Sequence, residues 1–298
     1  MDDLEDLEWR AWTDGAAALA LAERKLLGYD TTPNSRDALA AVKRSAALGD
    51  EHGRRALIYL TASGIGRPAD PAKARAMLTE LAKSDRFAAV QEQFLGHVTC
   101  ESKLAEVAPE VISADPYIAI YRGLFSAAEC RYLMILGRPW LETASILGDD
   151  GQEHIDTVRD AQACSIGSLT EDLVVQAVNR TIAAATRTTV GWGEPLNIIS
   201  YSPGQQYRMH HDGTGSDRVS VRNQTALIWL NDGYTGGETD FPRIKVRFRG
   251  AIGDMLVFHN VRANGTLDER MIHAGLPVTS GIKWLASRWI RGEDYLRG

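Results

Sequence analysis

Residues 195–213, PLNIISYSPGQQYRMHHDG, join a β-rich run to a segment that carries two histidines and an aspartate. On extended backbone, residues two apart project to the same side, whereas neighbours project to opposite sides. His210 and Asp212 can therefore share a metal ion, while His211 points away. The triplet alone is weak evidence, because it occurs often by chance. A third ligand must come from elsewhere, and His273 stands out because it opens a segment whose turn leads into a strand with alternating faces.

Short β-rich segments separated by glycine-rich turns dominate from residue 195 onwards and predict a sheet sandwich or barrel. The expected strands are 195–201, 224–231, 245–250, 254–260 and 283–291, together with 111–121, VISADPYIAIY, which would enter this domain. The expected supporting helices are 126–142, with Ser126 as N-cap, and 170–186, with Thr170 as N-cap. Helices combined with many short strands predict an α+β fold.

The N-terminal region has a different composition. Residues 14–98 are rich in alanine and leucine at helical spacing, and a shift of 36 residues places Gly28 on Gly64 and Ala38 on Ala74. This pattern predicts two helix–turn–helix units and resembles SEL1-like repeats, a branch of the tetratricopeptide group. The resemblance implies either a module that binds a partner protein or a helical cap on the next domain.

Three motifs, in this order and spacing, resemble the catalytic domain of prolyl 4-hydroxylases. They are Y-x-x-G-Q-x-Y-x-x-H-x-D at 201–212, T-x-L-x-W-L-N-D-x-x-x-G-G-E-T-x-F-P at 225–242 and H-A-G-x-P-V-x-x-G-x-K-W at 273–284. The resemblance spans roughly residues 112–292 and implies a double-stranded β-helix, a jelly-roll of the cupin kind. With the change in composition after residue 100, it predicts a helical domain at 1–108 and an oxygenase domain at 109–298.

The same resemblance implies roles for individual residues. His210, Asp212 and His273 would hold iron(II), and Lys283 would pair with the distal carboxylate of 2-oxoglutarate. Further matches fall on co-substrate positions, Tyr201, Thr225 and Trp289, and on substrate positions, Tyr207, Arg159, Glu194 and again Trp289. Strand alternation supports Lys283 independently, because it places this lysine on one face with Leu285, Ser287 and Trp289. A lysine on an inward face is costly unless an anion meets it.

The resemblance implies an iron(II)- and 2-oxoglutarate-dependent dioxygenase that hydroxylates an unactivated C–H bond, with ascorbate as reductant. Three protein ligands on an octahedral ion leave two positions for the 2-oxo acid and one for dioxygen. A prolyl residue in a peptide or protein is the first expected substrate. Only twelve residues separate Asp212 from Thr225, fewer than in many peptide-acting relatives, so a free amino or imino acid stays the alternative.

Two other classes of protein compete with this interpretation. A hydrolytic zinc enzyme could use two histidines and a carboxylate, but it would need a general base and would have no use for Lys283. A SEL1-like scaffold with an inactive oxygenase domain would be expected to have lost a metal ligand, whereas all three are present.

Composition limits the remaining possibilities. A formal net charge of -6 and a pI near 5.7 argue against nucleic acid as a partner, and alternating Arg243, Lys245, Arg247 and Arg249 are expected to form a solvated strand face. The acidic start MDDLEDLEWR and the lack of a long apolar run predict a cytoplasmic protein without a membrane segment. The three cysteines, with no close pair among them, are expected to be reduced bystanders.

Overall fold

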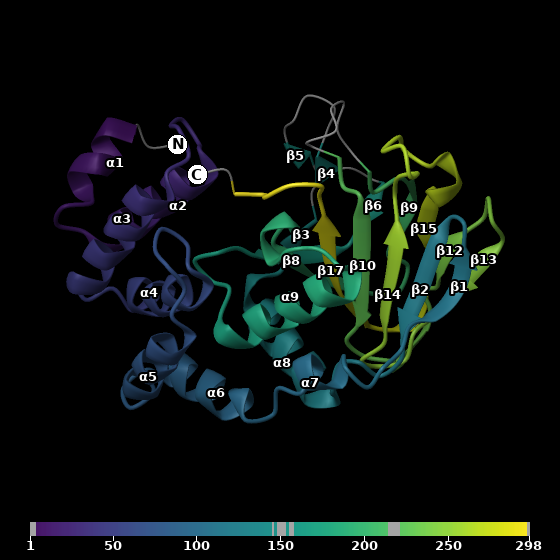
Figure 1. Ribbon diagram of the computed structural model, residues 1–298, viewed down its shortest axis with the longest axis horizontal. Helices are drawn as coiled ribbons and strands as arrows, with labels where there is room; N and C mark the ends of the chain where they lie inside the picture. Colours follow the sequence, from purple (N-terminus) through teal and green to yellow (C-terminus); the bar gives the residue numbers. More distant parts are fainter. Residues whose placement is uncertain (1–3, 145, 148–152, 155–157, 214–220, 297–298) are drawn as a thin grey trace. The chain divides into compact units, whose positions relative to one another are not determined.

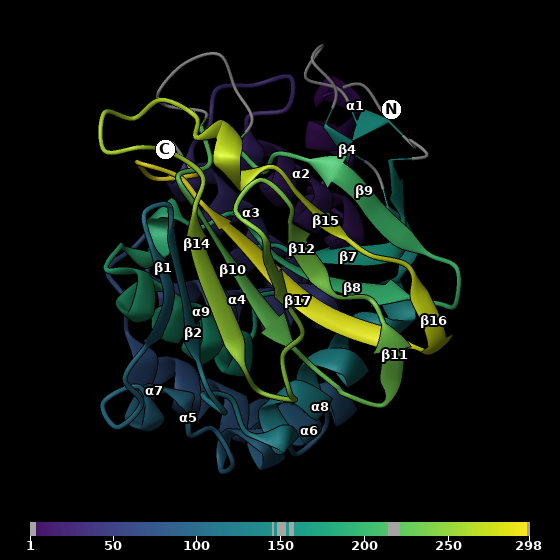
Figure 2. The ribbon, with the colours of Figure 1, turned by 90° about the vertical axis from the view of Figure 1, so that its right-hand side faces the viewer.

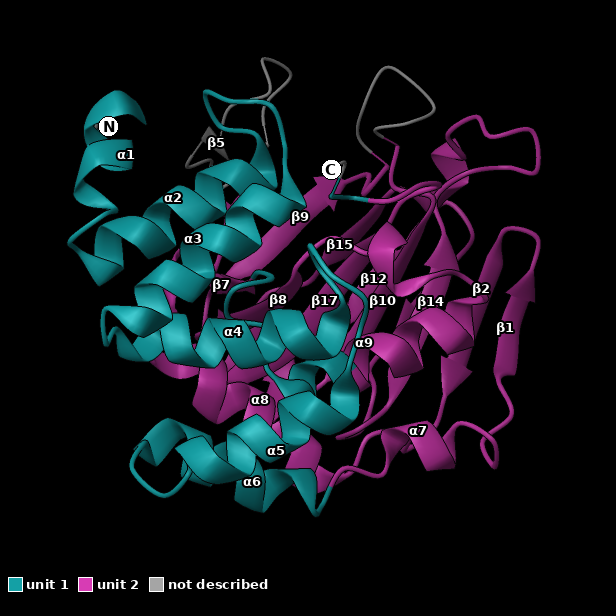
Figure 3. Cartoon of the chain, turned by 60° about the vertical axis from the view of Figure 1, so that its left-hand side comes forward, with its two compact units in different colours: residues 1–97, 167–176, 295–298 teal, residues 98–166, 177–294 magenta. Residues whose placement is uncertain are grey.

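The computed structural model describes residues 4–144, 146–147, 153–154, 158–213 and 221–296. The chain forms two compact units (Figure 3). Unit 1 comprises Met1–His97, Gly167–Gln176 and Tyr295–Gly298, and unit 2 comprises Val98–Ile166 and Ala177–Asp294. The expected boundary between residues 108 and 109 stays a prediction, and the structure adds a short segment, 167–176, to the N-terminal helices.

Unit 1 is helical (Figure 1). Its helices are α1 Leu4–Arg10, α2 Gly15–Leu27, α3 Ser35–Ala47, α4 Glu51–Ser63, α5 Pro71–Leu81 and α6 Arg86–Leu95. The α2–α3 pair recurs as α4–α5, and α2 and α4 end at Gly28 (φ 77°) and Gly64 (φ 85°) in the left-handed conformation. A side chain in this conformation costs about 1–2 kcal/mol, so the paired glycines mark true helix ends. The two predicted helix–turn–helix units are confirmed.

Short polar side chains begin these helices. The side chains that accept hydrogen bonds from backbone N–H groups of the first turn belong to Asp14, Asn34, Asp50 and Asp70. Small residues fill the helix contacts, and Ala38 and Ala74 have no exposed surface. The alanine-rich composition therefore reflects helices that pack closely.

Unit 2 contains two main antiparallel sheets (Figure 2). The larger has the order β1-β2-β14-β10-β17-β8-β7-β3, and the smaller has the order β13-β12-β15-β9-β6. The larger sheet comprises β1 Glu110–Ala114, β2 Tyr117–Tyr121, β3 Glu142–Thr143, β7 Gln162–Ile166, β8 Leu196–Tyr201, β10 Gln224–Trp229, β14 Met255–His259 and β17 Lys283–Ile290. The smaller comprises β6 Arg159–Asp160, β9 Gln206–His210, β12 Thr239–Phe241, β13 Val246–Phe248 and β15 His273–Gly275. Two short pairs join β11 Tyr234–Gly236 to β16 Val278–Gly281 and β4 Ile146–Leu147 to β5 Glu153–His154.

The two main sheets share one apolar core. Trp229 and Phe258 from the larger sheet and Phe241 from the smaller are fully buried in the same cluster. Alternation along β17 assigns its two faces. Leu285 enters this core, whereas Arg288 donates to the carbonyl of Asn179 in α9 (Leu173–Thr186), which continues from unit 1 into unit 2.

Helices also contact the larger sheet. Gly137, at the end of α8 (Ala127–Gly137), lies so close to β8 that an added Cβ would be 2.7 Å from Ile198 Cγ2. Ser126 is the N-cap of α8, as predicted, and it forms a reciprocal capping box with Glu129. The four-residue helix α7, Cys100–Lys103, precedes this part of unit 2. The predicted combination of helices and sheets is confirmed.

Several element boundaries differ from the predictions. Residues 111–121 were expected to be one strand but form the β1–β2 hairpin, because Pro116 in the turn cannot donate to a ladder. The helix expected over 126–142 ends at Gly137 and gives way to a 3-10 turn, Arg138–Trp140, where Pro139 lacks an N–H. The strand expected over 245–250 shortens to Val246–Phe248.

The helix expected over 170–186 starts later than predicted. The carboxylate of Asp172 accepts hydrogen bonds from the N–H groups of Val174 and Val175, while the Thr170 hydroxyl donates to the Gly167 carbonyl. Asp172, rather than Thr170, therefore occupies the capping position, and the first helical residue is Leu173. In the described part of the chain, no helix is both long enough and apolar enough to cross a bilayer.

Candidate metal centre and co-substrate pocket

Two paired strands and the segment after one of them bring three side chains together. His210 ends β9 and His273 begins β15, and the antiparallel register of these strands pairs the two residues directly. Asp212 lies two residues beyond the end of β9. One ligand atom from each of the three side chains lies within 4.8 Å of the others, and this is a group able to hold a metal ion.

The orientation of the rings suits a metal. His210 Nδ1 lies 2.7 Å from the Arg208 carbonyl, and His273 Nδ1 lies 2.9 Å from the Met271 carbonyl. Since a carbonyl can only accept, each Nδ1 carries a proton, and each Nε2 is turned toward the Asp212 carboxylate. The two Nε2 atoms lie 3.4 Å and 3.6 Å from the Asp212 carboxylate oxygens. Three donor atoms thus converge on one point.

Burial and proximity fix the charges of this group. Burial raises the pKa of Asp212, but the nearby His273 and His210 and the hydrogen bond from Thr225 lower it more, so the net pKa is below its ordinary value. Burial, followed by the neighbouring His210, lowers the pKa of His273 to about 4. At neutral pH the carboxylate is ionised and the His273 imidazole is neutral, which are the forms that bind a divalent cation.

A cavity with about 430 Å³ of empty volume, partly open to solvent, adjoins these ligands. The residues that line it come from both sheets and are Arg159, Ile199, Tyr201, Tyr207, His210, Asp212, Leu227, Thr239, His273, Gly275, Lys283, Leu285, Ser287 and Trp289. Eight of the ten residues predicted from the sequence to bind metal, co-substrate or substrate therefore line this cavity, and the other two, Thr225 and Glu194, do not.

Lys283 supplies a buried positive charge to the cavity. Its Nζ donates to the Gly237 carbonyl at 2.6 Å and lies 5.4 Å from the Tyr201 ring centroid. Burial lowers the pKa of Lys283 to about 7, and the negative charge of Glu238, which raises the pKa, offsets only part of this effect. A carbonyl is a neutral acceptor, so an anion that entered the cavity would stabilise the ammonium form.

Aromatic rings flank the ligands. The Tyr207 ring stacks on His210 with centroids 3.4 Å apart and an interplanar angle of 10°. The Arg159 guanidinium lies 5.3 Å from the Tyr207 ring centroid and 5.9 Å from the Trp289 ring centroid. Burial raises the pKa of the Tyr201 phenol, and the charge and hydrogen bond of Arg159 offset only part of this rise. These side chains form the wall of the cavity beside the metal ligands.

Thr225 contacts Asp212, a candidate metal ligand, and does not line the cavity. Its hydroxyl donates to Asp212 Oδ2 at 2.8 Å and accepts from Asn260 Nδ2 at 3.0 Å. Sequence reasoning missed Asn260, since nothing in DMLVFHN distinguishes an asparagine that ends a strand from one that orients a ligand. The predicted contact of Thr225 with the co-substrate stays a prediction.

Glu194 is also set back from the cavity. Its carboxylate accepts two hydrogen bonds of 2.8 Å from Arg222 and one of 2.9 Å from Arg291. The Arg222 guanidinium in turn lies 3.9 Å from the Trp289 ring centroid. Glu194 thus holds an arginine against a cavity residue, and its predicted contact with substrate stays a prediction. Sequence reasoning also missed Arg222, whose partners lie far away along the chain.

The other predicted polar features have ordinary surroundings. Arg243 and Arg247 form ion pairs with Glu269 and Asp240, and Arg249 donates to the Asp232 and Tyr234 carbonyls. The three cysteines, Cys100, Cys130 and Cys164, are free and buried. Burial raises the pKa of Cys100 and Cys130 to about 12 and that of Cys164 to about 11, so all three are thiols at neutral pH.

Two histidines and one carboxylate beside a cavity define a mononuclear metal site of the facial-triad class, the usual site for non-haem iron(II). The donor set fits that ion, because nitrogen and carboxylate oxygen ligands leave positions for other ligands. The buried ammonium of Lys283 fits a carboxylate of a small co-substrate in the same cavity.

Comparison with known proteins agrees with this class. The 2OG-Fe(II) oxygenase superfamily profile matches residues 196–291. Probable prolyl 4-hydroxylase 6 of Arabidopsis thaliana is 30% identical over 208 residues, which cover 62% of this chain and 72% of that protein. Prolyl 4-hydroxylase 1 of the same plant is 29% identical over 208 residues, which cover 63% of this chain and 74% of that protein. The structure of a viral collagen prolyl hydroxylase from Paramecium Bursaria Chlorella virus-1 has 25% identity and a TM-score of 0.48, over 59% of this chain and 96% of that one.

The chain belongs to the 2OG-Fe(II) oxygenase superfamily, in which these relatives are prolyl 4-hydroxylases. It is an iron(II)- and 2-oxoglutarate-dependent dioxygenase that uses molecular oxygen. The predicted enzyme class is confirmed, and so are iron(II), 2-oxoglutarate and dioxygen.

Proposed function

We propose that this dioxygenase hydroxylates a prolyl residue in a peptide or protein, with His210, Asp212 and His273 as the iron ligands. The observation that carries the proposal is the convergence of three donor atoms within 4.8 Å beside a buried lysine. Arabidopsis relatives named as prolyl 4-hydroxylases support the choice of substrate.

The chain's own groups place the reactants. Lys283 would pair with the distal carboxylate of 2-oxoglutarate, while the apolar side chains of Ile199, Leu227 and Leu285 line the cavity and exclude water. When bound, iron(II) supplies oxidation of a C–H bond by dioxygen, coupled to decarboxylation of 2-oxoglutarate to succinate and carbon dioxide. Thr225 and Asn260 hold the Asp212 carboxylate, and the two backbone carbonyls keep both imidazoles turned inward.

Tyr207, Trp289 and Arg159 are the side chains that we assign to substrate binding. Two aromatic rings and a guanidinium in one wall suit a flat imino-acid ring flanked by peptide carbonyls. The short connection between Asp212 and Thr225 favours a second candidate, a free amino or imino acid, because it offers less chain to cover a peptide. Residues 214–220 of that connection lie outside the described residues.

For the rest of the chain we propose the finer assignments made from the sequence. The sheets of unit 2 form a double-stranded β-helix of the jelly-roll kind, and the helix pairs of unit 1 are SEL1-like repeats that bind a partner protein or cap the catalytic domain. The pairs that recur at a 36-residue interval support the second assignment. Ascorbate as reductant and a cytoplasmic location stay predictions.

The test is succinate formation by purified protein with iron(II), ascorbate and 2-oxoglutarate. Proline-containing peptides should stimulate it and gain one oxygen atom, whereas stimulation by free proline alone would select the second candidate. Asp212→Ala should abolish succinate formation because it removes a proposed ligand. Succinate formation by Asp212→Ala at the wild-type rate would refute the assigned site.

A further inference from the structure

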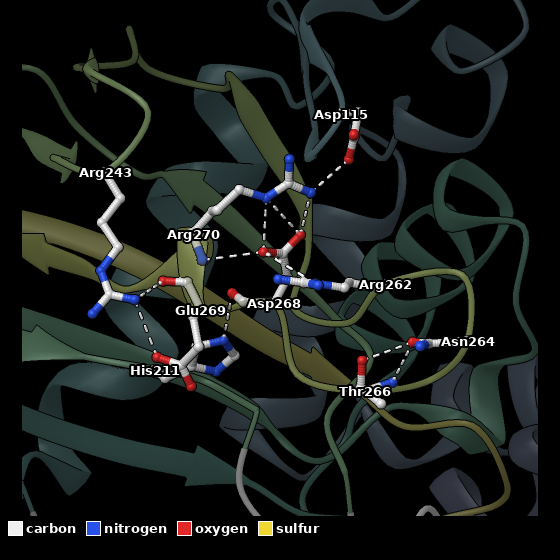
Figure 4. Close-up of polar contacts among 9 residues, drawn as sticks. All are labelled: Asp115, His211, Arg243, Arg262, Asn264, Thr266, Asp268, Glu269 and Arg270. Carbon is white, nitrogen blue, oxygen red and sulfur yellow. Dashed lines mark hydrogen bonds and ion pairs between the residues drawn. The ribbon is translucent and has the colours of Figure 1, made fainter.

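Residues 260–272 connect β14 to β15 and form a loop that is fastened to itself. The Asp268 N–H donates to the Asn260 carbonyl at 2.9 Å, and the Arg262 N–H donates to the Thr266 carbonyl at 2.8 Å. The buried Asp268 carboxylate accepts from Arg270 Nε at 2.9 Å and Nη2 at 2.6 Å, and Arg270 also reaches Asp115 at 2.7 Å (Figure 4). The base of the loop is therefore a rigid support.

This support orients two of the proposed ligands. The Met271 N–H donates to the Asp268 carbonyl at 2.8 Å, and the Met271 carbonyl accepts from His273 Nδ1 at 2.9 Å. At the other end of the loop, Asn260 holds the Thr225 hydroxyl, which donates to Asp212. The loop thus acts on the site from both of its ends.

Asp212 needs such support because the sheet does not supply it. The β9–β15 ladder ends at the pair of His210 and His273, and Asp212 follows two residues later. Its backbone position depends on contacts made by the residues around it. His211 supplies one of these contacts, on the side opposite to the cavity.

The His211 ring bridges the two segments. Its Nδ1 accepts from the Gly213 N–H at 2.9 Å, so the proton lies on Nε2, which donates to the Asp268 carbonyl at 3.1 Å. Figure 4 shows this ring directed at the Asp268 backbone. Gly213 packs tightly in the same place, since an added Cβ would lie 2.5 Å from Leu267 Cδ2.

We propose that His211 is a positioning residue, which ties the segment carrying Asp212 to the loop carrying His273 and so preorganises the metal site. The proposal rests on the proposed metal ligands. The Asp268 carbonyl accepts from both His211 and Met271, so displacement of His211 is passed to Met271, whose own carbonyl orients His273. Groups that orient metal ligands commonly change metal affinity by about 10–100-fold when they are lost.

The test compares two amides at position 211. Glutamine places its NH2 group about where His211 Nε2 lies and can donate to the Asp268 carbonyl, whereas asparagine is one methylene too short. We expect His211→Asn to raise the dissociation constant for Mn²⁺ alone, measured by equilibrium dialysis, by about 10-fold or more, and His211→Gln to stay near wild type.

Asn264→Ala is the matched control. It removes two hydrogen bonds of the same loop, which Asn264 Oδ1 accepts from the N–H and the hydroxyl of Thr266 (Figure 4). Neither bond involves a proposed metal ligand. It should lower the unfolding temperature without changing Mn²⁺ affinity. A general loss of loop stability would instead affect all three variants alike.

The outcomes separate this inference from the metal site itself. Equal Mn²⁺ affinity of His211→Asn and His211→Gln would overturn the positioning role, provided that Asp212→Ala weakens binding. If wild-type protein bound Mn²⁺ no better than Asp212→Ala, the proposed ligands would be wrong, and the positioning role would fall with them.

Discussion

The Lys283 ammonium is a charge that folding penalises and that a bound anion would stabilise. With its pKa lowered to about 7 by burial, this lysine loses its proton as the pH rises above neutrality. A dianionic co-substrate binds the protonated form, so the affinity for 2-oxoglutarate should fall above about pH 7, approaching tenfold per pH unit. The measurement is the dissociation constant of 2-oxoglutarate with Mn²⁺ and without oxygen, from about pH 6 to about pH 9.

Lys283→Arg is the control for this prediction. A guanidinium stays protonated throughout this range, so any binding that the variant retains should lose its pH dependence. A flat wild-type profile would contradict the charge assigned to Lys283. The stability of the fold should change with pH in the opposite direction to the affinity for 2-oxoglutarate. Since the folded pKa lies below the unfolded value of 10.5, the unfolded chain binds more protons between about pH 7 and this value, and the free energy of unfolding rises with pH there.

At this scale the sequence predicted the groups that touch the cavity better than those that hold them. His210, Asp212 and Lys283 follow from strand alternation and spaced motifs, which are local properties of the chain. Asn260 and His211 act through residues of a loop whose path depends on tertiary hydrogen bonds. Alternation alone correctly turned His211 away from the metal, but it could not show that the ring meets Asp268.

Glu129 links the starts of two helices and gives a prediction at the scale of the element. Its carboxylate accepts from the N–H groups of Ser126 at 2.6 Å, Thr99 at 2.8 Å and Cys100 at 2.9 Å, so it serves both α8 and α7. Glu129→Gln replaces one acceptor oxygen with a donor that faces buried N–H groups. We expect a loss of about 3 kcal/mol in the free energy of unfolding at pH 7, measured with urea.

The pH dependence distinguishes a charge effect from a packing effect. Burial raises the pKa of Glu129, but hydrogen bonds from Ser126, Thr99 and Cys100 lower it more, so the folded pKa lies below the ordinary value of 4.5. The stabilisation is present above this value and is lost as the pH falls through the folded pKa. The difference in the free energy of unfolding between Glu129→Gln and wild type should therefore shrink in acid. The control is Glu142→Gln, at an exposed position, which should have little effect on stability. If the difference in the free energy of unfolding were the same in acid as at pH 7, the effect of Glu129→Gln would be one of packing alone.

Elements were predictable where their signals are local and failed where two signals compete. The Ser126 N-cap was predicted, because the serine directly precedes the amphipathic helix that it caps. Thr170 and Asp172 are both good caps, and the choice between them depends on where the chain turns after Gly167. The β1–β2 hairpin has apolar residues on both sides of Asp115 and Pro116, so its sequence also suits one longer strand.

At the scale of the whole molecule, residues 167–176 make unit 1 discontinuous in sequence. Leu169 packs on the cluster formed by α1 to α4, and Leu173 packs on the cluster that contains Ile58 and Leu78. Gln176 Nε2 donates to the Tyr59 carbonyl at 3.0 Å. Since Leu173 and Gln176 lie in the first turn of α9, the start of a helix that continues into unit 2 depends on the N-terminal helices.

A chain of residues 98–298 should therefore be a poor substitute for the full protein, although it contains every proposed metal ligand. Without residues 1–97 the apolar side chains of Leu169 and Leu173 lose their packing partners, and exposed apolar surface promotes association. We expect a lower unfolding temperature and stronger binding of a hydrophobic dye than in the full chain. A chain that lacks only residues 1–13 loses α1 but keeps Tyr59, Ile58 and Leu78, so it should bind far less dye. The fragment 98–298 could instead unfold at the same temperature as the full chain. Residues 167–176 would then find sufficient packing within unit 2 alone, and the N-terminal helices would be free for a partner rather than needed as a cap.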